Sequence, residues 1–390
     1  MSRSLPRHLW QFSDLMMKAD AVGLYVHIPF CLRKCNYCDF CSFSDLSRDT
    51  RRRYIDKLKC EILGYKKDKR IKLDTVFFGG GTPSLLSPYE FSEICDAILE
   101  AFEISPSPEF TVEVNPKTVT PEKLSAFKSR GVNRVSIGLQ SIHENELKKL
   151  GRVHTFEDFL DAYKMVKAAG IKNISFDIMY GIPEQTKESF RKTLEKVVSL
   201  DPSHISVYGL ILEENTPFWD VRDKLPLPDE DTECDMYYLA SEILCKNGYS
   251  HYEISNYSKA GLESKHNLKY WRNMEYIGVG VAAYSYYGGK RYGNTRELSE
   301  YISSECKQYK DEEILSAADV AYEYAMLGLR LSEGISLSEY KRLSGKEFAK
   351  GKEDTLSHLL KAGYIIKEGD RIALTEKGFY ISNTILTELL

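Results

Sequence analysis

The sequence has no apolar run long enough to cross a bilayer, and its first twenty residues lack the hydrophobic core of a signal peptide. It has no basic block beyond 51–53 and 66–72, and the net charge is −4, so nucleic acid is not an expected partner. The chain has nine cysteines, and those outside residues 31–41 do not have the spacing of a disulfide framework. These absences predict a cytoplasmic protein with reduced thiols.

The pattern of strands and helices indicates an α/β fold with a large core. Between Val22 and Leu212, β-rich segments alternate with helix-length segments, which predicts parallel strands joined by right-handed crossovers. The expected strands are Gly23–Ile28, Thr75–Phe78, Phe110–Val114, Arg134–Ile137, Ile174–Ile178 and His204–Tyr208. The expected helices are Tyr54–Tyr65, Tyr89–Phe102, Pro121–Ser129, Phe156–Ala169 and Ser189–Leu200. This periodicity suits a partial (βα)6 TIM-like barrel and equally a doubly wound sheet.

After Leu212 the pattern changes. A helix over Cys234–Lys246 precedes Tyr249–Tyr257 and Tyr276–Tyr287, which we expect as strands that extend the sheet. The final segment has the order of a winged helix, with helices at Ala317–Leu331, Leu337–Leu343 and Asp354–Ala362 and a hairpin of Tyr364–Lys367 and Arg371–Leu374. It has no basic stripe, so we interpret it as a packing or lid module rather than a DNA-binding domain. The predicted division is an N-terminal extension (1–20), a core (21–300) and a winged-helix-like C-terminal domain (310–390).

The most informative segment is Cys31-Leu32-Arg33-Lys34-Cys35-Asn36-Tyr37-Cys38. Three thiolates leave one iron of a four-iron cluster without a protein ligand, and that iron can bind another molecule. A zinc site would need a fourth ligand at knuckle spacing, and Cys41 stands at the wrong gap. The segment follows an apolar run that predicts a strand, and a barrel strand delivers such a loop to the catalytic face. We therefore predict a cluster held by Cys31, Cys35 and Cys38, and favour the barrel.

Glycines and polar residues follow the other predicted strands. The run Gly79-Gly80-Gly81-Thr82 lets backbone N–H groups approach a ligand, although a tight turn has the same pattern. Glu113 ends the third strand, where an inward carboxylate is costly unless it meets a cation, either a ligand's or a nearby lysine's. Gln140, Arg152 and Asp177 lie at or just beyond the ends of the next two strands, on the side where barrel chemistry occurs.

A second unusual segment is His266-Asn267-Leu268-Lys269-Tyr270-Trp271. An imidazole as axial donor, with aromatic rings for stacking, suits a flat apolar ligand that carries a metal. A buried histidine in an aromatic-rich region is the alternative.

Together these motifs resemble the oxygen-independent coproporphyrinogen oxidase superfamily of radical S-adenosylmethionine (SAM) proteins, and most closely its haem-chaperone branch, HemW. The resemblance begins near Gly23 and continues to the C-terminus. It is carried by residues 25–31, 77–84, 136–141, 151–154, 176–183, 206–217 and 252–257. It implies a [4Fe-4S] cluster whose open iron binds the amino and carboxylate groups of SAM.

The resemblance also implies roles for individual residues. Tyr25 would approach the cluster-bound SAM, as the candidate catalytic residue, and Gly80 and Glu113 would hold it. The positions that hold a second SAM in the oxidase branch are matched by Tyr37, Gly81, Thr82, Gln140, Arg152 and Asp177. The His-Asn-x-x-Tyr-Trp element is the haem signature of the chaperone branch, which implies contacts from His266, Asn267, Tyr270 and Trp271, with His266 as axial donor.

Two departures from the family pattern affect the expected function. The oxidases have a further cysteine where this chain has Phe40, which argues against an oxidase and predicts that Cys41 is not a ligand. The chaperones usually read Gly-x-Gly-Pro-Gly-Ala-His-Ser, whereas Gly278–Ser285 reads Gly-Val-Gly-Val-Ala-Ala-Tyr-Ser, which indicates an altered pocket.

The resemblance therefore predicts a haem chaperone that binds the cluster, SAM and haem and transfers haem to an acceptor protein, such as a respiratory haem protein at the membrane face. It also favours a homodimer. The alternatives are an enzyme that decarboxylates coproporphyrinogen III to protoporphyrinogen IX and a radical SAM methyltransferase, so whether the protein is an enzyme stays open.

Overall fold

The computed structural model describes residues 21–66, 70–305 and 309–390. The predicted N-terminal extension, residues 1–20, lies outside the described residues. The first six strands are β1 (Val22–Ile28), β2 (Lys72–Gly80), β3 (Glu103–Val114), β4 (Arg134–Gln140), β5 (Asn173–Tyr180) and β6 (His204–Gly209). The later strands of the same sheet are β7 (Ser250–Glu253), β8 (Asn256–Ser258), β9 (Tyr276–Val279), β10 (Tyr284–Tyr287), β11 (Lys290–Gly293) and β12 (Lys310–Ile314). All six predicted core strands are therefore confirmed.

These strands form one 12-stranded sheet in the order β12-β11-β10-β9-β1-β2-β3-β4-β5-β6-β8-β7. Neighbours from β1 to β6 run parallel, as alternation with helices predicted. The two predicted extensions lie at opposite edges of this parallel unit, with β9 beside β1 and β8 beside β6. Each was expected as one strand and is two, because the chain turns between β7 and β8 and between β9 and β10.

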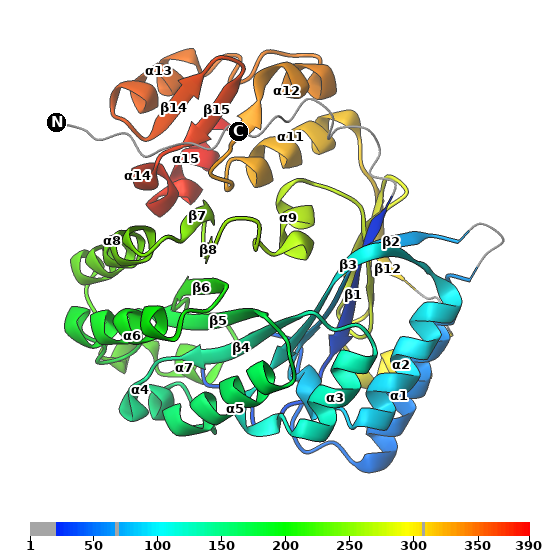
Figure 1. Cartoon of the computed structure of the whole chain (residues 1–390). Helices are drawn as coiled ribbons and strands as arrows, with labels where there is room; N and C mark the ends of the chain where they lie inside the picture. The colour runs from blue at the N-terminus through cyan, green and yellow to red at the C-terminus, as the bar shows by residue number, and fades with distance from the viewer. Residues whose placement is uncertain (1–20, 67–69, 306–308) are drawn as a thin grey trace.

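Helices cover the convex side of the curved sheet (Figure 1). They are α1 (Arg48–Leu63), α2 (Pro88–Ala101), α3 (Pro121–Ser129), α4 (Glu144–Lys149), α5 (Phe156–Ala168), α6 (Lys187–Leu200) and α8 (Glu230–Lys246). Shorter helices are α7 (Pro217–Asp220), α9 (Lys265–Trp271) and α10 (Leu298–Ser303), with single 3₁₀ turns at Pro83–Leu85, Pro116–Thr118 and Arg222–Lys224. The start of α2 illustrates the local signals: Ser87 and Glu90 form a capping box and Pro88 is the first helical residue.

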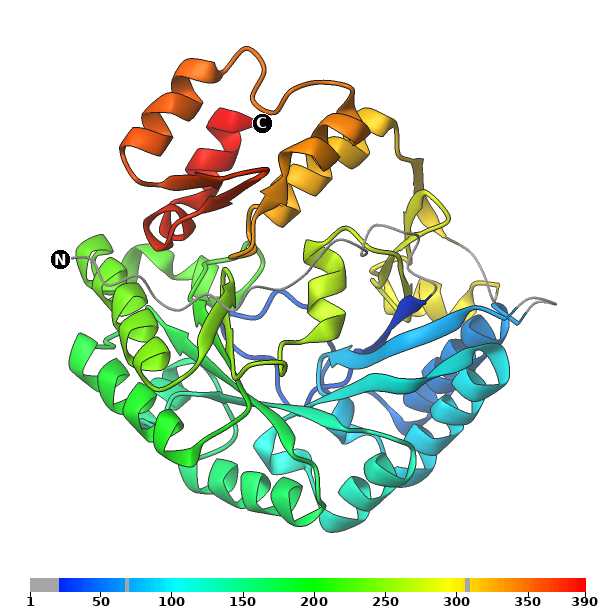
Figure 2. The same ribbon diagram turned by 45° about the horizontal axis from the view of Figure 1, so that its top comes forward.

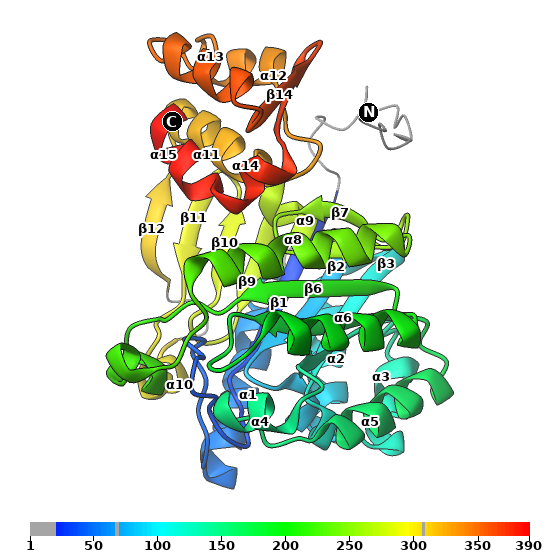
Figure 3. The same ribbon diagram turned by 90° about the vertical axis from the view of Figure 1, so that its left-hand side faces the viewer.

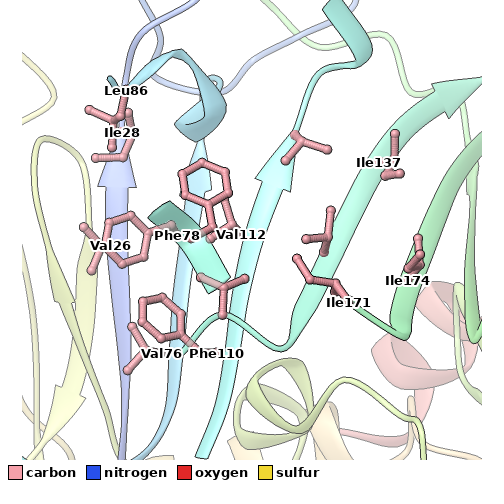
Figure 4. Close-up of a cluster of buried hydrophobic side chains, with 14 of the residues drawn as sticks. Val26, Ile28, Val76, Phe78, Leu86, Phe110, Val112, Ile137, Ile171 and Ile174 are labelled. Atoms are coloured by element: carbon pink, nitrogen blue, oxygen red, sulfur yellow. The ribbon is translucent and has the colours of Figure 1, made fainter. Parts of the chain in front are cut away.

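The core lies between the sheet and these helices (Figure 4). Successive side chains of a strand point to opposite faces, so Leu24, Val26 and Ile28 of β1 are fully buried against the helices. The alternate residues of β1, Tyr25 and His27, then face the concave side, where the site is built. The strand periodicity thus serves both the core and the site.

We expect Phe91→Ala to lower the free energy of unfolding by about 3–5 kcal/mol. The ring of Phe91 is 0% exposed and lies 4.5 Å from that of Phe127 and 5.0 Å from that of Phe78, measured between centroids. Tyr89, two residues earlier in α2, is 67% exposed, and Tyr89→Ala should change stability by no more than about 0.5 kcal/mol. Denaturant unfolding of both variants measures this, and equal losses would contradict the packing described.

Helix α9 lies on the concave side of the sheet (Figure 2). Its first backbone N–H groups, those of Lys265 and His266, donate to the carboxylate of Glu109 on β3, each at 3.0 Å. Farther along the helix, the ammonium of Lys269 lies 2.8 Å from the carboxylate of Asp74 on β2. Because Asp74 is near the start of β2 and Glu109 pairs with the adjacent Thr75, α9 lies toward the amino ends of the parallel strands.

The C-terminal unit contains α11 (Ala317–Gly328), β13 (Ile335–Ser336), α12 (Leu337–Ser344), α13 (Glu353–Lys361), β14 (Ile365–Glu368), β15 (Arg371–Leu374), α14 (Glu376–Tyr380) and α15 (Ser382–Leu389). The predicted order of three helices and a hairpin is confirmed, while β13, α14 and α15 were not predicted. The unit packs beside α8, α9 and β7 (Figure 3). Arg272, just after α9, forms an ion pair with Glu333 at 3.0 Å. No helix in the described part of the chain is long and apolar enough to span a membrane.

Candidate functional site

The cysteine loop follows β1 and is held by backbone hydrogen bonds. Cys31 N donates to Phe43 O at 3.0 Å, and Asn36 N donates to Leu150 O at 3.0 Å. The loop is therefore fastened both to its own returning strand and to the segment after α4. This brings the thiols of Cys31, Cys35 and Cys38 to the carboxyl end of the parallel strands, partly exposed to solvent.

Two polar side chains from other elements face these thiols. The hydroxyl of Thr82 lies 3.8 Å from Cys31 Sγ, and Arg152 Nη1 lies 3.7 Å from Cys35 Sγ. Burial raises the pKa of Cys31, and it raises that of Cys38 to about 11, so these groups are thiols in the protein alone. Cluster binding would release their protons, as metal binding to cysteine does. A guanidinium beside Cys35 suits a thiolate-bound cluster.

No set of three or more His, Cys, Asp or Glu side chains among the described residues converges on a single metal ion. In a four-iron cluster each cysteine binds a different iron, so its thiolates need not converge on one point. The loop is therefore compatible with a four-iron cluster.

The remaining cysteines lie apart from this group. Cys41, expected not to be a ligand, donates its S–H to Arg296 O at 3.4 Å. Free thiols are carried by Cys31, Cys35, Cys38, Cys41, Cys95, Cys234 and Cys245. Cys60 is disulfide-bonded, so the prediction of reduced thiols is wrong at that position. It rested on spacing, which identifies a regular disulfide framework but says little about a single pair.

Tyr25, Gly80 and Glu113, the predicted SAM contacts, lie together. Gly80 N donates to Glu113 Oε2 at 3.2 Å, and a Cβ added at Gly79 would stand 3.0 Å from the Tyr25 ring and 3.2 Å from Glu113 Oε2. Gly80 has a φ of 109°, which favours glycine. Burial, reinforced by the nearby carboxylate of Asp177, raises the pKa of Glu113 to about 8. Among the described residues, no Lys or Arg forms an ion pair with this half-buried carboxyl, which therefore fits a cationic ligand.

The residues predicted for a second SAM surround Arg152. Its Nη2 donates to Gly138 O at 2.9 Å, and a Cβ on Gly138 would lie 3.1 Å from the amide nitrogen of Gln140. The hydroxyl of Tyr37 is a further partner of the guanidinium. Asp177 accepts from the Ser136 hydroxyl at 2.9 Å, and its pKa is raised by burial.

Among the described residues, the buried Nε of Arg152 has no hydrogen-bond partner. Gly81, which follows β2, donates its N–H to Ile28 O at 2.8 Å and so places Thr82 beside Cys31. The unpaired Nε of Arg152 and the raised pKa of the nearby Asp177 are the arrangement expected of a site that receives a polar ligand.

His266, the predicted axial donor, is 1% exposed and has a hydroxyl at each ring nitrogen. Thr75 Oγ1 lies 2.8 Å from its Nδ1, and the Tyr270 hydroxyl lies 2.8 Å from its Nε2. Burial, together with the nearby charge of Lys269, lowers its pKa to about 3, so the ring is neutral. Its face stacks on Phe77 at 5.2 Å between centroids. In this conformation neither nitrogen is free to bind iron.

The other residues of that element have separate surroundings. Tyr270 lines a cavity of about 420 Å³, whereas Asn267 and Trp271 do not. Trp271 instead lies under the guanidinium of Arg330, at 5.9 Å from the ring centroid. Within the 266–271 segment, Tyr270 therefore lies in the cavity wall, whereas Trp271 lies at the junction with the C-terminal unit.

The cavity stands beside the predicted SAM contacts and shares Tyr25 with them. Its lining comprises Tyr25, His27, Asp39, Phe40, Cys41, Tyr270, Tyr276, Ala282, Ala283, Tyr284 and Arg296. Its volume lies within the range of small-molecule sites, which are mostly apolar with a few placed polar groups. Four tyrosines, one phenylalanine and one arginine make it suited to a flat ligand with an acidic edge.

Known proteins resemble this chain over most of its length. Residues 25–197 match the Radical SAM superfamily, and residues 315–381 match the HemN C-terminal domain. The haem chaperone HemW of Lactococcus lactis is 36% identical over 369 residues, which cover 94% of this chain and 96% of that protein. HemW of Bacillus subtilis is 35% identical over 373 residues, and HemW of Escherichia coli is 32% identical over 381 residues, each over 98% of its own length. The chain belongs to the HemW family.

The fold of this chain is also found in a solved structure. Coproporphyrinogen III oxidase (HemN) of Escherichia coli superposes with a TM-score of 0.82 over 95% of this chain and 90% of that chain, at 22% identity. At that identity the likeness establishes the fold alone, and it confirms the predicted radical SAM partial barrel. Where the HemW pattern has glycine, this chain has Ala282, with a φ of 59°. The backbone there keeps the left-handed conformation despite the substitution.

Sequence reasoning missed several residues of this candidate site. His27 is buried between the Tyr25 hydroxyl, 3.0 Å from its Nδ1, and Cys41 O, 2.8 Å from its Nε2. Strand alternation could have found it, because Tyr25 and His27 share one face of β1. No local signal identifies Tyr276 or Arg296, which reach the cavity only because β9 lies beside β1 and the chain returns after β11.

Proposed function

We propose that this protein is a haem chaperone that holds one [4Fe-4S] cluster, SAM and haem and passes haem to an acceptor protein. The observation that carries the proposal is the aromatic cavity, which shares Tyr25 with the SAM contacts. A haem bound there would be adjacent to the cluster loop.

The cluster would be held by Cys31, Cys35 and Cys38, with Arg152 offsetting the charge near Cys35. Tyr25, Gly80 and Glu113 would hold the SAM on its open iron. A second SAM would be held by Tyr37, Gly81, Thr82, Gln140, Arg152 and Asp177. When bound and reduced, the cluster supplies an electron to the sulfonium of SAM.

Haem contacts from α9 are part of the proposal. Tyr270 would face the haem directly, and His266 would set the position of that phenol through the 2.8 Å hydrogen bond. Asn267 and Trp271 would act through the same helix, at its start and at its junction with Arg330. The Thr75 hydroxyl is hydrogen-bonded to the other ring nitrogen of His266 and would hold the imidazole in this position.

Partners follow from this role. The acceptor would be a haem protein, and one at the face of the cytoplasmic membrane would fit a donor that works in the cytoplasm. A homodimer is the oligomeric state that we propose. The HemW relatives are named as haem chaperones, which supports this account over the enzymatic alternatives.

Anaerobic incubation of the reconstituted protein with SAM, a reductant and coproporphyrinogen III separates chaperone from enzyme. We expect no protoporphyrinogen IX, because Phe40 replaces the oxidase's additional cysteine and faces the cavity. Chromatography of the porphyrinogens after oxidation measures it. Formation of protoporphyrinogen IX would contradict the proposal, and a methylated product would support the methyltransferase alternative instead.

A further inference from the structure

The haem cavity contains only a few groups that could donate to iron, and the structure constrains most of them. This inference rests on the proposed function, because it concerns how the same cavity holds haem. His27 is unsuitable, because Cys41 O can only accept, so His27 Nε2 must donate and its Nδ1 lone pair accepts from the Tyr25 hydroxyl. Both nitrogens are therefore engaged.

Other donors near the cavity are also engaged or unfavourable. His266 lies behind Tyr270 and has a hydroxyl 2.8 Å from each nitrogen. The Cys41 thiol donates to Arg296 O, and burial raises its pKa, which disfavours the thiolate that binds iron. Burial likewise raises the pKa of the phenols of Tyr25, Tyr270 and Tyr276.

Tyr284 differs from these groups in two respects. It lines the cavity and is 44% exposed, and within the described residues its hydroxyl has no hydrogen-bond partner. It stands where the family pattern has histidine. Tyrosine is an established axial ligand of haem iron. A free phenol at the mouth of an aromatic cavity can meet iron without breaking an existing contact.

The backbone around Tyr284 holds this phenol in a defined place. Its ring lies over Gly293 of β11, where a Cβ would stand 2.7 Å from the ring. The preceding turn is fixed by the buried carboxylate of Glu61, which accepts from Gly280 N at 3.0 Å and from the Tyr301 hydroxyl at 2.6 Å. Asn294 donates to the other oxygen of Glu61 at 2.7 Å. Tyr284 is thus presented by a rigid scaffold.

Arg296 supplies the second feature of a haem site. Its side chain is 61% exposed at the cavity, and Asp39 lies 3.8 Å from its guanidinium. A guanidinium at that distance from its partner can donate to a carboxylate of a ligand in the fork geometry that arginine favours. A haem propionate has the required chemistry.

We propose that Tyr284 is the axial donor to haem iron in this cavity, with Arg296 binding a haem propionate. His266 is then a positioning residue that acts through Tyr270. The histidine that the family pattern places at 284 would be replaced by a phenolate donor, which prefers ferric iron.

The test is titration of the full-length, anaerobically reconstituted protein with ferric haem, read by Soret absorbance and resonance Raman spectroscopy. Wild type should show tyrosinate vibrations, which Tyr284→Phe removes while raising the haem dissociation rate about tenfold. Tyr287→Phe is the matched control, because it removes a hydroxyl from the same strand, β10, outside the cavity lining, and it should keep the wild-type spectrum. Tyr284→His should convert the spectrum to that of an imidazole-bound haem.

The outcomes separate this inference from the proposed function. Suppose that wild type binds haem, that Tyr284→Phe keeps the wild-type spectrum and that His266→Ala changes it. His266 is then the iron ligand and the inference is wrong, while the chaperone proposal stands. If wild type binds no haem, the proposed function fails and Tyr284 loses its role with it. A spectrum that is lost only in Tyr284→Phe and altered in Tyr284→His supports the inference.

Discussion

Replacement of Cys31, Cys35 or Cys38 by Ala is expected to remove the broad iron–sulfur absorbance of the reconstituted protein or to leave a fragmentary cluster. Each thiol is presented by the same loop, which Asn36 and Cys31 fasten through backbone hydrogen bonds to segments distant in sequence. With one thiolate missing, two irons lack a protein ligand rather than one. Iron and sulfide content, measured after anaerobic reconstitution, gives the result directly.

Cys41→Ala is the matched control for that prediction. Cys41 belongs to the same loop and is also partly exposed, but its S–H points to Arg296 O in the neighbouring cavity. Its loss should leave the cluster absorbance intact. A cluster that disappears in the Cys41 variant but survives in one of the other three would show that the ligands are wrongly assigned.

Glu113→Gln should weaken SAM binding to the reconstituted protein about 10- to 100-fold, as expected for a lost hydrogen bond to a charged group. The carboxyl of Glu113 is half-buried beside Gly80 and Tyr25, and its pKa of about 8 means that it is protonated in the free protein at neutral pH. Holding the amino group of SAM favours the carboxylate, so binding releases this proton below about pH 8. Wild-type affinity should therefore rise with pH up to that value.

The variant should lose this part of the pH dependence, so that its affinity rises less steeply than that of wild type between neutral pH and pH 8. Equilibrium dialysis of labelled SAM at several pH values measures both effects. Glu109→Gln makes the same change four residues earlier in β3, where the carboxylate caps α9, and should leave SAM affinity unchanged. Equal pH profiles for wild type and the Glu113 variant would remove Glu113 from the SAM site.

The barrel could be predicted from the sequence because its signals are local. The β-rich run of β1 and the capping box of Ser87 with Glu90 depend on neighbouring residues. Every predicted core strand overlaps an observed one, although β3 and α1 begin several residues earlier than predicted. Short elements such as β13 were missed, because two residues carry no periodicity. The two extensions were expected as single strands because aromatic β-formers continue through their turns.

The site was predictable only in part, for a different physical reason. Cysteine spacing and the glycine run identify the loop because their chemistry depends on adjacent residues. The surroundings of His266 depend instead on distant residues, because Thr75, which engages its Nδ1, is far away in the sequence. Likewise, Tyr284 and Arg296 reach the cavity from β10 and from the segment after β11. Residue type alone does not reveal that the Tyr270 hydroxyl is engaged while that of Tyr284 has no partner among the described residues.

The most direct test of the haem-chaperone account is anaerobic titration of the reconstituted wild-type protein with haem, read at the Soret band. The account predicts a shifted band that grows to a sharp end point at equimolar haem and protein, because one aromatic cavity takes one flat ligand. A band that keeps the spectrum of haem in buffer and grows without saturation would contradict it.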